Sequence, residues 1–151
     1  MAAGSTASYA HTKEESDQKI SIENRIKNRN FIFVANIALP MGGRSVQLNG
    51  WYDLKVSGDS LVSHLPYFGR AFSAPMNPTD GGYIFTSTDI KYEVRDLGKE
   101  SWQVEIIPSD RGKGEKYLMD VFANGTATLR VSSNNRQPIT FQGFVRERSR
   151  R

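Results

Sequence analysis

The chain of 151 residues is long enough for one domain with a hydrophobic core of its own. No stretch approaches the roughly 18 apolar residues that a membrane-spanning helix needs. The sequence contains no cysteine, which excludes disulfides, thiolate catalysis and cysteine-ligated metals.

The net charge of +4 lies mostly at the C-terminal end, where the last eight residues carry +3 of it. A nucleic-acid-binding barrel would place Lys or Arg between aromatic residues on one strand face. The outward positions of one predicted strand, Lys91, Glu93 and Arg95, instead mix both signs. We therefore predict a short basic tail at 147–151 and no nucleic-acid partner.

The N-terminal region divides into two parts. Residues 1–10 are small and polar, without the basic and apolar regions of a signal peptide, and predict a disordered lead-in. The following segment is highly charged, but Ile22 and Ile26 are spaced four apart and share one helical face. This spacing predicts an amphipathic helix over about 12–29 that covers a rim or end of the main domain.

From Phe31 onward the hydrophobic period changes from helical to two, which is typical of strands. Short turn signals separate the apolar runs, the strongest being Asn124-Gly125. Tyr83 to Val94 is predicted as one strand or a kinked pair. Together these segments predict an all-β fold, an antiparallel meander of about eight strands that forms a barrel or a barrel-like sandwich. A closed or nearly closed barrel is favoured because closure removes exposed edges, and 11–146 is expected to be a single domain.

One connection stands out in this meander. The 17 residues 66–82 are rich in aromatics, prolines and glycines, and their length alone indicates a functional loop or lid. Tyr67, Phe68, Arg70 and Phe72 are the candidate ligand-binding or lid residues. Arg70 is expected either to stack on Tyr67 or Phe68 and lock the loop, or to clamp an anion at a pocket mouth.

Catalytic signals are weak. The sequence has only two histidines, His11 and His64, too few for a zinc site. Asp53 and Asp59 lie on segments adjoining His64, so a carboxylate–imidazole pair is conceivable, but turn formation and outward strand phase explain both acids more simply. We therefore predict a protein that is not an enzyme, with no catalytic residues, no metal and no cofactor.

Five segments stand out as a set: Gly58–Ser60, Leu65–Phe72, Gly81–Phe85, Val121–Ala127 and Arg136–Gly143. Together they resemble the family called domain of unknown function 4251, which comprises generally exported proteins of Bacteroides-type bacteria. The resemblance extends from about the predicted helix to Val145. It implies an exported, periplasmic or cell-envelope all-β protein, with a lipid anchor on the full-length precursor as one option, and it supplies no activity.

Two functional hypotheses from different classes remain open at this point, with a hydrolase third. The first is a non-enzymatic binding barrel that takes an apolar or amphipathic small molecule beneath the aromatic loop. The second is a structural or protein-interaction module of the envelope, with a filled barrel and an envelope protein as partner. Whether the interior is hollow separates the two, and we expect the aromatic residues of the loop to fill it.

Overall fold

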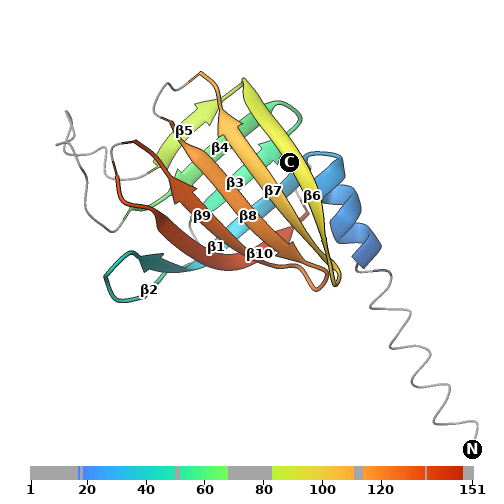
Figure 1. Ribbon diagram of the computed structural model, residues 1–151, viewed down its shortest axis with the longest axis horizontal. Coiled ribbons are helices and arrows are strands. Elements are labelled where there is room, and N and C mark those ends of the chain that lie inside the picture. Colours follow the sequence, from blue (N-terminus) through green and yellow to red (C-terminus); the bar gives the residue numbers. More distant parts are fainter. Residues whose placement is uncertain are drawn as a thin grey trace, which may run out of the picture.

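The computed structural model consists of a strongly curled antiparallel sheet with one helix at one end (Figure 1). The structure describes residues 17, 19–49, 52–67, 83–110, 114–134 and 136–147. Within these ranges, no helix has the length and apolar character needed to cross a membrane. The all-β fold with an N-terminal helix confirms the fold class predicted from the sequence.

The described strands form one ten-stranded sheet in the order β5-β4-β3-β1-β10-β9-β8-β7-β6, with the short β2 paired to β1. Every pairing is antiparallel. The strands are β1 (Asn30–Pro40), β2 (Val46–Gln47), β3 (Asp53–Ser57), β4 (Ser60–Leu65), β5 (Tyr83–Ser87), β6 (Ile90–Gly98), β7 (Ser101–Pro108), β8 (Lys116–Phe122), β9 (Thr126–Ser132) and β10 (Ile139–Arg146).

The sheet is a meander whose first and last long strands, β1 and β10, pair with each other. Its two ends are β5 and β6, which only Thr88 and Asp89 separate in the chain. This corner is fastened by Asp110, which accepts hydrogen bonds from the Ser87 hydroxyl at 2.6 Å and the Thr88 amide at 3.4 Å. The segment predicted as one strand or a kinked pair is therefore a kinked pair. Because β5 and β6 do not pair with each other, the sheet is a curled half-barrel and not a closed barrel.

The pairing of β1 with β10 contains an irregularity that only glycine accommodates. The register shifts between Ala35 and Ile37, and Gly143 lies opposite Ala35. A Cβ atom at position 143 would overlap the carbonyl group of Val34. The shift brings the two backbones close together, and irregularities of this kind increase the local bend of a sheet.

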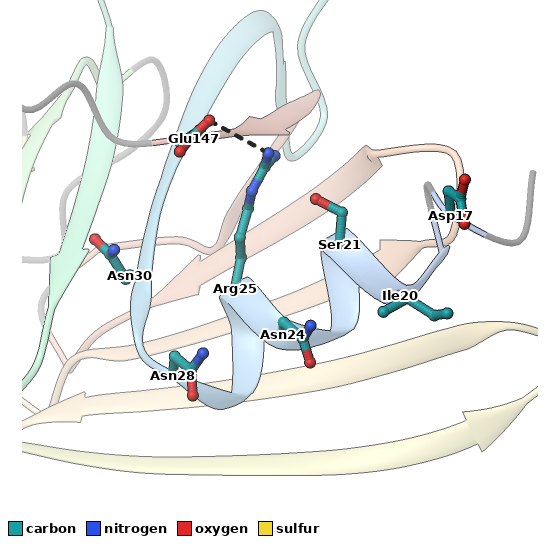
Figure 2. A pocket seen from close by; sticks show the side chains of 8 residues that line it. All are labelled: Asp17, Ile20, Ser21, Asn24, Arg25, Asn28, Asn30 and Glu147. Atoms are coloured by element: carbon teal, nitrogen blue, oxygen red, sulfur yellow. Dashed lines mark ion pairs between the residues drawn. The ribbon is translucent and has the colours of Figure 1, made fainter. Parts of the chain in front are cut away.

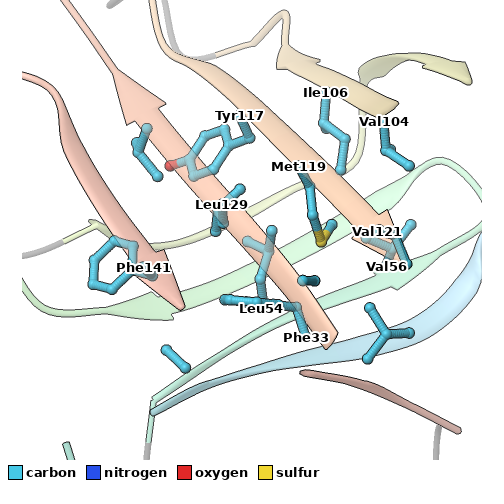
Figure 3. Packing of buried hydrophobic residues seen from close by; sticks show 14 of the residues in the cluster. Phe33, Leu54, Val56, Val104, Ile106, Tyr117, Met119, Val121, Leu129 and Phe141 are labelled. Atoms are coloured by element: carbon cyan, nitrogen blue, oxygen red, sulfur yellow. The ribbon is translucent and has the colours of Figure 1, made fainter. Parts of the chain in front are cut away.

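The interior of the barrel is occupied by large side chains from the inward positions of the strands (Figure 3). Alternate residues of β8, such as Tyr117, Met119 and Val121, are all fully buried, as the period of two requires. The largest side chains with under 2% exposure are Ile26, Phe31, Phe33, Leu54, Leu61, Leu65, Tyr83, Ile106, Tyr117, Met119, Leu129 and Phe141.

The helix, described over residues 19–27, contributes two of its isoleucines to this core. Ile22 and Ile26 are 3% and 0% exposed, whereas Ile20, off their face, is 54% exposed. The Tyr92 hydroxyl of β6 donates to the Ile26 carbonyl at 2.6 Å, which satisfies a terminal acceptor of the helix. Arg29 follows in a left-handed conformation with φ of 53° and binds Asp59 at 2.9 Å, fixing the exit toward β1.

Candidate ligand-binding site

The candidate site lies at the barrel end where β4 ends, β5 and β8 begin, and β9 ends. We call this end the mouth. Tyr83 and Tyr117 occupy inward positions of β5 and β8, and three further side chains come from the adjoining connections. The mouth cluster comprises Tyr67, Tyr83, Glu115, Tyr117 and Arg136.

The three tyrosines of the mouth cluster form a chain of edge-to-face contacts. The rings of Tyr67 and Tyr83 lie 5.9 Å apart at 84°, and those of Tyr83 and Tyr117 lie 6.0 Å apart at 78°. This geometry places the positive edge of one ring against the negative face of the next. Tyr83 and Tyr117 are buried, while Tyr67 is half-buried, so the chain leads from the interior to the surface.

Hydrogen bonds attach two of the tyrosines to the connection between β9 and β10. The Tyr67 hydroxyl donates to the Gln137 carbonyl at 3.0 Å, and the Tyr83 hydroxyl donates to the Ser133 hydroxyl at 3.3 Å. Both acceptors lie in the connection between β9 and β10, whereas Tyr67 follows β4 and Tyr83 begins β5. The cluster therefore ties the start of the long connection to the far side of the mouth.

Arg136 supplies the positive charge of the mouth cluster. Its guanidinium lies 4.9 Å from the ring centroids of both Tyr67 and Tyr83, within the range of a cation–π contact. Glu115 lies deeper, at 4% exposure, and accepts a long hydrogen bond of 3.4 Å from Tyr117. The site thus brings together aromatic surface, a cation and a buried carboxylate at one end of the barrel.

Burial dominates the proton affinity of the two outer tyrosines. Loss of water raises the pKa of Tyr67, against smaller lowering effects of the Gln137 hydrogen bond and the Arg136 charge. Burial likewise raises the pKa of Tyr83, opposed by its hydrogen bond to Ser133 and by Arg136. Both phenols therefore stay neutral hydrogen-bond donors at physiological pH.

The structure places one of the four predicted lid residues, Tyr67, in this cluster. Phe68, Arg70 and Phe72 lie outside the described residues. The cation that stacks on Tyr67 is Arg136, which the sequence reasoning did not assign to this site. The only signal that could have indicated Arg136 is its place in a motif that resembles the family pattern.

The histidine candidate lies on the outer face of the barrel. His64 is exposed and stacks on Tyr52 with ring centroids 5.4 Å apart. Asp53 faces it in the β3–β4 register, whereas Asp59 lies in the turn at the other end of these strands, bound to Arg29. The structure therefore brings Asp53 to His64 but separates Asp59 from both.

The described part of the chain contains no group of three or more His, Asp or Glu side chains arranged to hold a metal ion. The chemistry available at the mouth among these residues is therefore aromatic contact, hydrogen bonding and charge pairing.

Comparison with known proteins agrees with this architecture. Residues 13–145 match the family described as domain of unknown function DUF4251. The chain belongs to this family. The match confirms the resemblance in the sequence, and it covers the helix, the whole sheet and the mouth cluster.

A DUF4251 family protein from Bacteroides eggerthii, known from a crystal structure, has a similar fold. The TM-score is 0.57 at 16% sequence identity, and the similarity covers 88% of this chain and 87% of that one. At this identity the likeness concerns the fold alone. Among curated proteins, no significant match was found.

Proposed function

We propose that this DUF4251 protein is a non-enzymatic binding module that takes an apolar or amphipathic small molecule at the mouth of its barrel. The observation that carries the proposal is the half-buried Tyr67 ring, held between Tyr83 and Arg136 at the mouth. Small-molecule sites combine aromatic surface with a few placed polar groups, and barrel mouths are frequent locations for them.

The mouth is a better location for a ligand than the barrel axis. Side chains such as Leu54, Met119 and Leu129 are fully buried along that axis and occupy its space. A ligand there would have to displace close-packed side chains, whose removal costs several kcal/mol each. At the mouth, a ligand needs only to cover the exposed side of Tyr67.

Arg136 gives this site a preference among amphipathic ligands. Its charge acts on both Tyr67 and Tyr83, as its lowering influence on the pKa of each phenol indicates. A ligand with an apolar body on the Tyr67 ring and a polar or anionic end near Arg136 would use both features. Glu115, more deeply buried, would oppose a second anionic group.

Calorimetric titration of the full chain with decanoate and indole-3-acetate, one aliphatic and one aromatic amphiphile, tests the proposal. Replacing Arg136 by Gln should weaken binding about tenfold, because the cation contact is worth up to about 2 kcal/mol. Arg130→Gln is the matched control, since Arg130 is exposed on the outer face of β9. Absence of binding by both probes, or equal weakening in the two variants, would contradict the proposal.

We further propose that the protein works in the cell envelope, exported and attached by a lipid on its full-length precursor. The support is the family membership, taken with the exported character that the sequence resemblance implies. Fractionation of the native host with an antibody to this chain should recover it with the envelope. Recovery in the cytosolic fraction would contradict this location.

The filled interior also supports a second candidate, a protein-interaction module. On the outer face beside the sheet end, Ile84 of β5 is 56% exposed and Val62 of the neighbouring β4 is 37% exposed. An end strand with apolar side chains and no charge favours pairing with another strand. Crosslinking in envelope extracts with a photoreactive residue at position 84 should then capture a protein partner, and an equal yield from position 93 on β6 would argue against it.

A further inference from the structure

A groove follows the helix on the side away from the mouth cluster. One pocket of about 400 Å³ lies between the helix and the end of β10, and a second of about 440 Å³ shares Ser21 and Arg25 with it. Both volumes are in the range of small-molecule sites. We call the two together the helix groove; Figure 2 shows the residues of the first pocket.

The helix groove is lined mainly by neutral polar side chains that both donate and accept hydrogen bonds. Ser21, Asn24 and Asn28 share one side of the helix, and Asn30 stands at the start of β1 (Figure 2). From Ser21 to Asn28 this polar row spans about 10 Å along the helix axis. The row continues past Ser21 to Asn124 and Thr126 in the second pocket.

The charges of the helix groove do not suit a polyanion. Arg25 pairs with Glu147 at 3.7 Å, and Asp17 adds a second acid, so the lining carries one more negative than positive group. Phosphate or nucleic-acid ligands need an excess of cations. The groove therefore favours a neutral ligand with many hydroxyl or amide groups.

The helix groove also contains an exposed aromatic ring. Phe144, on the outer face of β10, lines the second pocket and is 37% exposed. An aromatic face next to carboxamides and hydroxyls complements a pyranose ring, which has an apolar C–H face and a rim of hydroxyls. Each carboxamide can accept from one hydroxyl and donate to its neighbour.

We infer that the helix groove is a second binding site, for a neutral oligosaccharide. The sugar rings would stack on Phe144 and extend along Ser21, Asn24 and Asn28, while the Arg25–Glu147 pair offers charge-assisted hydrogen bonds at the centre. This inference is independent of the ligand proposed for the mouth, because the two sites share no residue.

Titration of the ¹⁵N-labelled full chain with maltotetraose, cellotetraose, xylotetraose and chitotetraose tests the inference. At least one probe should shift the amide signals of Ser21, Asn24 and Phe144. Phe144→Ala should weaken that binding about tenfold, since aromatic contacts contribute up to about 1.5 kcal/mol. Phe122→Ala is the matched control, because Phe122 is 43% exposed on β8 and lines neither pocket.

Two results would overturn the inference. One is the absence of any shift with all four sugars at millimolar concentration. The other is a set of shifts centred elsewhere, at Tyr67 and Arg136 for example, or an affinity that Phe144→Ala leaves unchanged. Tyr67→Ala should leave sugar binding intact, so failure at the mouth and failure at the groove are distinguishable.

Discussion

The two ends of this barrel are closed by different kinds of contact. At the helix end, Ile22 and Ile26 cover the core from a single continuous segment, and the Tyr92 hydroxyl donates to the Ile26 carbonyl at 2.6 Å where the helix ends. At the mouth, residues distant in sequence meet through stacked rings and hydrogen bonds, as between Tyr67 and Gln137. The helix end thus combines apolar burial, which has little directionality, with a few polar contacts where the helix ends, and the mouth is built from several stacked rings and hydrogen bonds that fix orientation.

The difference indicates which end is suited to which task. Stacked rings with fixed hydrogen bonds hold their surface in one geometry, which lowers the entropic cost of binding a ligand. An amphipathic helix with two anchors closes the opposite end and leaves its polar side free to line a groove. Substitutions at the two ends should therefore differ in how much they lower the free energy of unfolding and in how far along the chain their effects extend.

The largest effect is expected at the mouth. Tyr83→Ala removes a ring that is 1% exposed and that contacts both Tyr67 and Tyr117, so it should lower the free energy of unfolding by about 3–5 kcal/mol. Tyr83→Phe keeps the ring and loses only the hydrogen bond to Ser133, which should cost about 1 kcal/mol. Urea unfolding measures both. Similar losses in the two variants would show that the stacked rings are not what closes the mouth.

A smaller effect is expected at the helix end. Ile26→Ala opens a cavity under the helix and should lower the free energy of unfolding by about 3 kcal/mol, with loss of amide protection greatest in residues 19–27. Ile20→Ala is the control, because Ile20 is 54% exposed and its removal should change stability by less than about 0.5 kcal/mol. Equal losses in the two variants would contradict the assignment of Ile26 as an anchor.

The smallest effect is expected in how stability changes at alkaline pH, which can be measured for one buried tyrosine at each end. Burial raises the pKa of Tyr83 at the mouth and of Tyr92 under the helix above the ordinary value of 10.0. The folded protein therefore holds the two phenol protons more tightly than the unfolded chain. The resulting contribution to the free energy of unfolding is complete below pH 10 and declines as pH rises above it.

Each buried phenol should lower stability by up to about 1.4 kcal/mol per pH unit in that window. Tyr92→Phe and Tyr83→Phe should each make the decline shallower, which urea midpoints at a series of alkaline pH values can measure. A decline unchanged in both variants would mean that other groups cause it.

Much of the fold could be predicted because its signals are local. The four-residue spacing of Ile22 and Ile26 predicted the buried helical face, and Asn124-Gly125 marks the turn between β8 and β9. The strand count was nearly right, since nine long strands and the two-residue β2 stand where about eight were expected.

The candidate site was harder to predict because its contacts join distant segments. Arg136 approaches the Tyr67 ring from the β9–β10 connection, far from it in sequence, whereas the predicted role of Arg70 lies outside the described residues. Glu115 follows a polar Gly/Lys segment and reads as a surface residue, yet it is 4% exposed. Neither placement has a periodic signal, because each depends on how the strand ends meet when the sheet curls.

The most direct test of the mouth as the ligand site is a ¹⁵N chemical-shift titration of the full chain with decanoate. We expect shifts centred on Tyr67, Tyr83 and Arg136, with the interior amides of Leu54 and Leu129 unchanged. Shifts centred on Leu54 and Leu129 would contradict this expectation, because they would mean that the ligand enters the interior of the barrel.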